Sequence, residues 1–304
     1  MTADAGLVFS RFVHFTALLF AFGICFFPLY AFSGSEVAAR WNMRSRFKAS
    51  LLAACLVALV SGVFWLVFTA ASMAGSLAEV LNSNTLASVL GESAFGRVWT
   101  IHLALIIVLC SLAAADFWGR PRSAFLIVAL SAACLASLAG VGHTQEEEGA
   151  AFLMRIAADG AHLLAAGAWL GGLVALLAVL PSKAGLADRS KSDVGHVLMR
   201  FSGTGYWAVA ILLGTGLINM WYQVPDLSQL TAAFYGQLLI LKLGLFGLML
   251  VLAVVNRFWL VPALVGSGAR NLHRLRNHII GEQVLGVLII ALVSVIGTLA
   301  PFGE

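Results

Sequence analysis

Two ionisable side chains, Asp159 and His162, stand within a long apolar segment of the chain. They are three residues apart, so in a helix they share one face, and Trp169 continues that face seven residues later. An Asp inside a membrane costs at least ~2.5–3.5 kcal/mol on insertion scales, so such groups normally face the interior of a helix bundle and mark a functional site. We therefore expect Asp159 and His162 to belong to a buried site.

Three further histidines, His14, His102 and His143, lie on other apolar segments towards the same side. Imidazole suits copper, zinc, iron and nickel, and a carboxylate either completes such a site or orients a ligating histidine. A single histidine in such a segment would more simply form a hydrogen bond to a hydroxyl or carbonyl group, without any metal. Because four separate segments supply them, we predict a metal site of His14, His102, His143 and His162, with Asp159 as a ligand or as the partner of one.

Three methionines, Met73, Met154 and Met220, also fall at the ends of apolar segments on this side. Their thioethers favour Cu(I). Methionine more often fills gaps in a hydrophobic core, so these residues are secondary candidates for metal binding.

Two more ionisable residues lie inside apolar segments and have a structural interpretation. Lys242 needs a partner, and Asp159 is the obvious one; if they pair, Asp159 is a weaker candidate for a direct ligand. Glu282 is expected to pair with Arg257 or with His278, four residues before it.

Eight apolar segments position these residues. Of the 304 residues, 61% are hydrophobic and 11% are charged, and the mean hydropathy is +0.96, which excludes an ordinary soluble domain. A membrane-spanning helix needs roughly 20 predominantly apolar residues. The spans are predicted at 7–33, 48–76, 97–118, 121–142, 155–180, 197–221, 235–260 and 277–300.

The fold follows from the membrane environment. Backbone groups in lipid must be paired within the segment, so the spans are predicted to be helices, and the turn residues of a β-barrel do not recur. No linker or close internal repeat divides the chain. The sequence thus predicts an all-α integral membrane protein: a bundle of eight transmembrane helices in one domain, residues 1–304.

Charge sets the expected orientation and excludes some functions. Most of the 18 Lys and Arg residues lie in loops on one side, which the positive-inside rule assigns to the cytoplasm. Both termini are therefore predicted to be external, and the basic pI reflects orientation rather than nucleic-acid binding. The four cysteines form no CxxC pair and no Walker-type motif occurs, so neither a cysteine zinc site nor ATP hydrolysis is predicted.

The chain resembles the copper resistance protein D family of bacterial inner-membrane proteins across all eight spans. The resemblance rests on "GH" at 142–143, D-x-x-H-x-x-x-A-x-x-W-x-G-G-L at 159–173 and "FS" at 201–202. It continues with "YGQLLILKL" at 235–243, "NRFWLVP" at 256–262 and Glu282 in the last span. The pattern at 159–173 is the most specific of these.

The resemblance implies copper handling at the inner membrane, with the external side facing the periplasm. By this analogy His143, Asp159 and His162 are the positions to carry over. It also implies a periplasmic copper-binding donor protein, expected here as a separate chain.

Three functions stay open at this point. The first is capture of Cu(I) or Cu(II) at the histidine site and import into the cytoplasm, by a transporter that is not an enzyme. The second is electron transfer through haem b held by two of the histidines. The third is delivery of copper to periplasmic proteins without transport.

Overall fold

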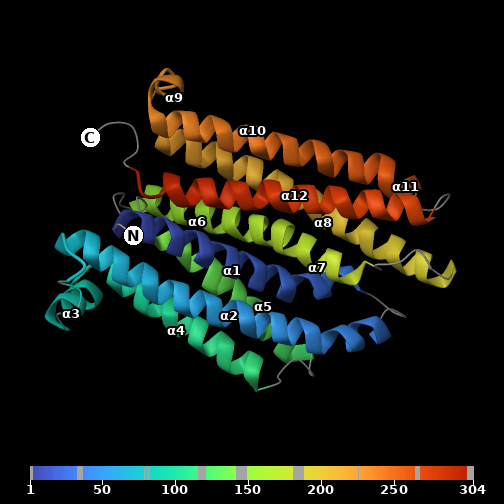
Figure 1. Ribbon diagram of the computed structural model, residues 1–304, viewed down its shortest axis with the longest axis horizontal. Coiled ribbons are helices and arrows are strands. Elements are labelled where there is room, and N and C mark those ends of the chain that lie inside the picture. The colour runs from blue at the N-terminus through green and yellow to red at the C-terminus, as the bar shows by residue number, and fades with distance from the viewer. Residues whose placement is uncertain are drawn as a thin grey trace.

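Eight helices of the protein are long and apolar enough to cross a membrane, among the residues that the computed structural model describes. Those residues are 3–32, 37–78, 80, 83–115, 121–141, 149–180, 188–224, 226–263 and 268–299. The helices lie lengthwise beside one another, and the start of α1, the end of α12, α3 and α9 share one end of the bundle (Figure 1). The prediction of an all-α membrane protein with eight spans is confirmed.

The membrane-crossing elements are α1 (Ala3–Ala31), α2 (Val37–Ala74), α4 (Ala94–Ala114), α5 (Pro121–Ala136) with the 3-10 turn η4 (Ser137–Gly140), α6 (Gly149–Ala166) with η6 (Gly167–Gly171) and α7 (Gly172–Val179), α8 (Asp188–Gln223), α10 (Phe234–Val255) with η7 (Asn256–Leu260) and α11 (Val261–Ala263), and α12 (Gly268–Ile296). Two short helices, α3 (Ser83–Glu92) and α9 (Gln229–Ala232), lie in connections. The segments η6 and η7 are π-helical.

The predicted spans agree with these helices, with one systematic difference. Helices α2, α8 and α12 begin at residues 37, 188 and 268, well before the apolar spans predicted to start at 48, 197 and 277. A helix can continue into water beyond the hydrocarbon, where charged side chains carry no burial cost, so hydropathy marks the span and not the end of the helix.

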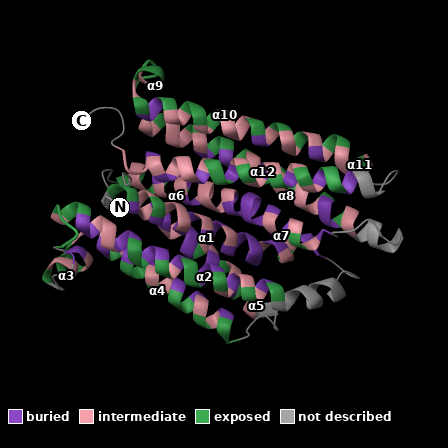
Figure 2. Ribbon diagram, viewed as in Figure 1, coloured by how far each residue is buried: buried purple, intermediate pink, exposed green. Residues whose placement is uncertain are grey.

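Helix α1 forms the centre of the bundle. It packs against α2, α5, α8, α12 and the η6–α7 segment. Leu18, Ile24 and Phe27 on α1 are almost completely buried, and buried residues gather on α1 and α7 in Figure 2. In contrast, few residues of α10 are fully buried, so α10 lies at the edge of the bundle.

A pair of glycines lets α1 approach the segment that carries Trp169. A Cβ atom on Gly23 would overlap the backbone of Gly171, and one on Gly171 would overlap the Leu19 carbonyl oxygen. Small residues at helix crossings allow this close approach in membrane proteins. The two glycines therefore fix the distance between α1 and η6.

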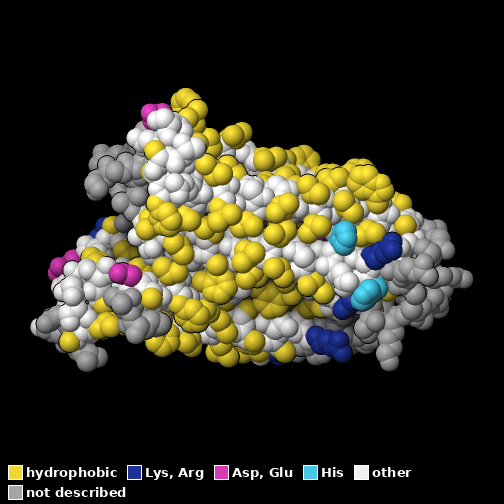
Figure 3. Space-filling model, turned by 45° about the horizontal axis from the view of Figure 1, so that its top comes forward, with side chains coloured by type: hydrophobic (Ala, Val, Ile, Leu, Met, Phe, Trp, Pro, Cys, Tyr) yellow, Lys and Arg dark blue, Asp and Glu magenta, His cyan; other side chains and the backbone are white. Residues whose placement is uncertain are grey.

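Charged side chains gather at the two ends of the bundle. In Figure 3 acidic side chains lie at the end that carries α3 and α9, most Lys and Arg lie at the other end, and an apolar band separates them. This distribution matches the charge asymmetry of the loops. Which end faces the cytoplasm stays a prediction.

Candidate metal site

His14 on α1 and His102 on α4 meet inside the bundle. Both side chains are completely buried, and their Nε2 atoms are 2.8 Å apart. Two neutral imidazoles at this distance share one hydrogen, which one ring donates and the other accepts. Two ring nitrogens from different helices are thus directed at one point.

The second nitrogen of His14 is fixed by α2. Its Nδ1 is 2.9 Å from the Ala58 carbonyl oxygen and 3.1 Å from the Ser61 hydroxyl oxygen. Because a carbonyl oxygen can only accept, Nδ1 of His14 carries the hydrogen. Nε2 of His14 then presents a lone pair towards His102, the arrangement that a metal ligand requires.

His102 is held by Ser137 of η4. Nδ1 of His102 is 2.7 Å from the Ser137 hydroxyl oxygen, which also lies 2.8 Å from the Cys134 carbonyl oxygen. A hydroxyl can donate to Nδ1 or accept a hydrogen from it. Ser137 can therefore satisfy His102 whichever ring nitrogen is protonated.

Aromatic rings close the space around the pair. The Trp99 ring stacks on His102 with centroids 4.8 Å apart, and Trp65 meets the edge of His14 at 5.6 Å. Trp99 is itself held by an indole hydrogen bond of 3.1 Å to the Gly62 carbonyl oxygen. A Cβ atom at Gly62 would lie 3.1 Å from the His14 ring, so the site leaves little free space.

His162 and Asp159 form a second polar cluster, between α6 and α8. Nδ1 of His162 is 2.9 Å from the Thr215 hydroxyl oxygen, and that hydroxyl donates to the Ile211 carbonyl oxygen at 2.6 Å. Nδ1 is therefore the donor to Thr215, and Nε2 of His162 keeps its lone pair. Asp159 accepts a 2.5 Å hydrogen bond from Asn219.

Two positively charged side chains lie close enough to this second cluster to interact with it electrostatically. Lys242 of α10 and Arg155 of α6 both attract the Asp159 carboxylate electrostatically. The neutral Asn219 donates a hydrogen bond to Asp159, whereas the sequence pointed to Lys242 as its partner. Lys242 also acts unfavourably on a protonated His162.

The other predicted ligands lie apart from the histidine pair or beyond the described residues. His143 falls outside the described residues. Met73 and Met154 are exposed, with 59% and 54% of their surface accessible, and Met220 is half-buried. Met154 accepts a 3.5 Å contact from the Tyr222 hydroxyl. Within the described residues, no three His, Cys, Asp or Glu side chains stand close enough to hold a metal ion together.

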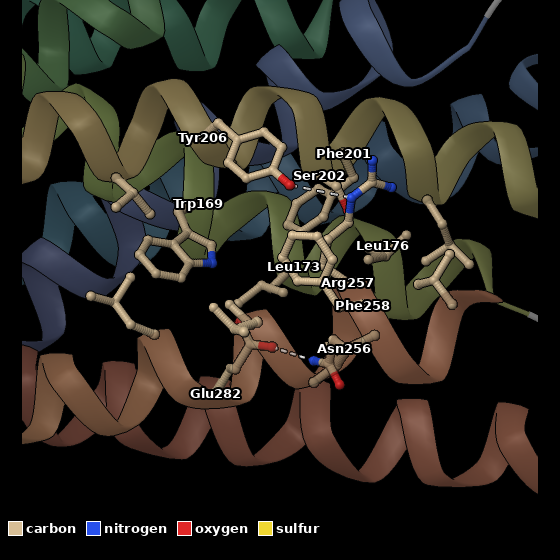
Figure 4. A pocket seen from close by; sticks show the side chains of 18 of the residues that line it. Trp169, Leu173, Leu176, Phe201, Ser202, Tyr206, Asn256, Arg257, Phe258 and Glu282 are labelled. Atoms are coloured by element: carbon tan, nitrogen blue, oxygen red, sulfur yellow. Dashed lines mark hydrogen bonds between the residues drawn. The ribbon is translucent and has the colours of Figure 1, made fainter. Parts of the chain in front are cut away.

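Glu282 lies in a third polar location, on α12. The side chain is 2% exposed and accepts a 2.5 Å hydrogen bond from Asn256 of η7 (Figure 4). Arg257, one of its expected partners, donates instead to the Tyr206 hydroxyl at 3.4 Å. Trp169 is 3% exposed and lies near the same carboxylate.

Nothing in the sequence alone indicates the hydroxyl and amide partners at these three locations. Ser137, Asn219 and Asn256 are common residue types, and nothing in their spacing relates them to a histidine or a carboxylate on another helix. Asn256 is a partial exception, because it lies in "NRFWLVP" at 256–262, one of the motifs that carry the family resemblance.

Comparisons with known proteins agree with the geometry of a membrane bundle. The model "Copper resistance protein D-like, N-terminal domain" matches residues 1–153, and "Copper resistance protein D" matches residues 195–296. Copper resistance protein D of Pseudomonas syringae pv. tomato is 31% identical over 298 residues, which covers 96% of this chain and 95% of that protein. No solved structure matches.

Two further relatives span different lengths. Inner membrane protein YebZ of Escherichia coli (strain K12) is 30% identical over 292 residues, 96% of this chain and 97% of YebZ. Copper transport protein CutJ of Bacillus subtilis (strain 168) is 27% identical over 263 residues, 83% of this chain and 46% of CutJ. The chain is therefore a multi-pass membrane protein that belongs to the copper resistance protein D family.

Proposed function

We propose that this protein binds copper as Cu(I) between His14 and His102 and carries it across the membrane towards the cytoplasm. The observation that supports this is the 2.8 Å approach of two buried Nε2 atoms from separate helices. Two ligands in line suit Cu(I), whereas Zn²⁺ takes four ligands and Cu(II) prefers a tetragonal set.

Binding requires a small rearrangement of the pair. Metal–imidazole bonds are roughly 2.0 Å long, so an ion between two Nε2 atoms holds them about 4 Å apart. The rings must separate by about 1 Å from their present hydrogen-bonded distance. Side-chain rotation of this size leaves the Nδ1 contacts with Ala58 and Ser137 in reach.

The proton on Nε2 of His102 must also move. In the present arrangement His14 accepts this hydrogen, so the metal competes with it. When the hydrogen transfers to Nδ1 of His102, the Ser137 hydroxyl accepts from Nδ1 and turns its own hydrogen to the Cys134 carbonyl oxygen. Copper then binds two neutral imidazoles and no proton leaves the site, so the only charge added to the buried site is that of the ion.

The cluster of Asp159 and His162 is proposed as a weaker station for copper on the entry side. Nε2 of His162 has a lone pair available, and the family resemblance adds His143 to the same set. Lys242 and Arg155 repel a cation, and the Asp159 carboxylate offsets that repulsion. Copper arriving from a periplasmic donor protein would pass here briefly before it reaches the histidine pair.

Haem at the histidine pair is disfavoured by the packing. A bis-histidine haem needs a wide planar space between the two Nε2 atoms. Here those atoms are 2.8 Å apart, and Trp65 and Trp99 pack against the rings. Delivery of copper without transport remains the competing function, and uptake measurements separate it from import.

The test is copper content in protein purified in detergent under reducing conditions and reloaded with Cu(I). We expect His14→Ala and His102→Ala each to lose the bound copper, and X-ray absorption of the wild type to show nitrogen neighbours in low coordination. His273→Ala, on the exposed face of α12, is the matched control. Copper retained by both pair variants would overturn the site.

Uptake into vesicles that contain the reconstituted protein tests the transport step. We expect His102→Ala to abolish uptake and His162→Ala to slow it while copper stays bound at the pair. Wild-type protein that binds copper but accumulates none in the vesicle would make it a delivery factor.

A further inference from the structure

A cavity lies apart from the histidine pair, between α7, α8, η7 and α12. Its volume is about 340 Å³, and it is walled mainly by apolar and aromatic side chains (Figure 4). Ligand pockets are typically of this size or larger, mostly apolar, with a few placed polar groups. This cavity has such groups in Asn256, Glu282 and Arg257.

The cavity opens towards lipid. Its innermost residues, Trp169, Leu173 and Glu282, are buried, whereas Tyr206 on α8 and Phe258 on η7 are more than half exposed. Helices α8 and α10 make few direct contacts with each other, so the entrance lies between them. A molecule dissolved in the bilayer can therefore reach the interior.

One buried polar atom in the wall has no partner. Asn256 is 8% exposed and uses its amide nitrogen on Glu282, while its Oδ1 is buried without a hydrogen bond among the described residues. Buried polar atoms are nearly always paired, so Oδ1 of Asn256 requires a hydrogen-bond donor that none of the described residues supplies. The donor has to come from a ligand or from water.

The backbone around this atom is also unusual. Trp169 lies on the π-helical segment η6, and Asn256, Arg257 and Phe258 lie on the π-helical segment η7. π-helical turns are rare and frequently occur at functional sites. Here two of them border one cavity.

We propose that this cavity binds the hydroxylated ring of a lipid-soluble molecule of the hydroquinone class. A ring hydroxyl donates to Oδ1 of Asn256, beside Glu282. The oxygen on the far side of the ring accepts from Arg257, whose guanidinium lies across the cavity next to Tyr206 (Figure 4). Trp169, Phe201 and Phe258 cover the faces of the ring.

The chemistry of the cavity disfavours other occupants. A lipid acyl chain would fill the apolar part but leave Asn256 unpaired. A phospholipid phosphate would bring a second negative charge against the buried Glu282 carboxylate. The polar wall atoms are oxygen and nitrogen of carboxylate, amide and guanidinium, which do not select Cu(I).

The experiment measures binding of a decyl-chain benzohydroquinone to the full chain in lipid nanodiscs, by equilibrium dialysis under reducing conditions. We expect saturable binding, at least tenfold weaker in Asn256→Leu, which keeps the number and branching of the side-chain heavy atoms and removes the acceptor. Asn277→Leu makes the same change on the exposed face of α12 and should bind as the wild type does.

A chemical variant keeps the test decisive if Asn256→Leu fails to fold. The dimethyl ether of the same hydroquinone has the same ring but no hydroxyl donor, and we expect it to bind wild-type protein at least tenfold more weakly. Equal binding of the two compounds, or no saturable binding, would overturn the proposal. His14→Ala should bind the hydroquinone normally, so the outcome is independent of the copper site.

Discussion

Single hydroxyl and amide side chains govern the buried ionisable groups of this protein. Ser61 meets Nδ1 of His14, and Ser137 meets Nδ1 of His102. The buried Glu282 and the half-buried Asp159 each accept from an asparagine on a neighbouring helix at 2.5 Å. At Glu282 the neutral donor satisfies the carboxylate without bringing a second full charge out of water, which avoids the desolvation cost of a buried ion pair.

Ser137→Ala is expected to weaken Cu(I) binding by roughly 10- to 100-fold, because the partners of metal-ligating histidines typically contribute that much. Alanine cannot accept the Nδ1 hydrogen that His102 carries when copper occupies Nε2. The measurement is competition for Cu(I) with a chromophoric chelator. Ser137→Thr keeps the hydroxyl and should restore affinity, and Ser111→Ala, on the exposed side of α4, is the control. Unchanged affinity in Ser137→Ala would refute this role for the serine.

At the scale of elements, close packing of the central helix determines where the polar residues stand. Helix α1 contacts both α2 and the η6–α7 segment, so it links the histidine pair to the span that carries Asp159, His162 and Trp169. Gly23 and Gly171 set the approach of α1 to η6. In an interior packed this tightly, even a small change in the distance between α1 and η6 displaces the neighbouring side chains.

Gly171→Ala is expected to destabilise the protein by about 1–3 kcal/mol, since the added methyl group overpacks the crossing with α1. Gly244→Ala, on α10 with open space around it, should be neutral or slightly stabilising, because alanine favours helix over glycine by about 1 kcal/mol. Thermal unfolding in one detergent compares the two variants. Similar melting temperatures for both would contradict the role given to the crossing.

The whole molecule has two chemically distinct ends. The acidic end and the basic end are separated by an apolar band (Figure 3). The histidine pair and the cavity at Asn256 are built from largely different helices. The protein therefore has room for two independent ligands in one bundle.

Reporter fusions at each terminus test the orientation of this bundle. The concentration of Lys and Arg at one side predicts that this side is cytoplasmic, so a reporter active only outside the cytoplasm should be active at both the N-terminus and the C-terminus. A fusion at the 181–187 connection should show the opposite behaviour. Termini that report as cytoplasmic would reverse the proposed direction of copper movement.

Much of the fold could be predicted from the sequence because a bilayer imposes a length and a composition on every span. The eight helices appear close to their predicted positions, and Asp159, His162, Trp169 and Glu282 lie inside the bundle in whole or in part. The helix extensions of α2 and α8 could not be predicted, since hydropathy does not register a helix in water.

By itself the sequence determined the number of spans, the sorting of charge and the presence of buried histidines, since these depend on local composition and on the cost of placing polar groups in lipid. The tertiary structure decided that His14 meets His102 while His162 meets Thr215. It also supplied Ser137, Asn219 and Asn256 as partners. Such pairings depend on the rotation and crossing of each helix, which are set by side-chain packing across the bundle and leave no periodic trace along the chain.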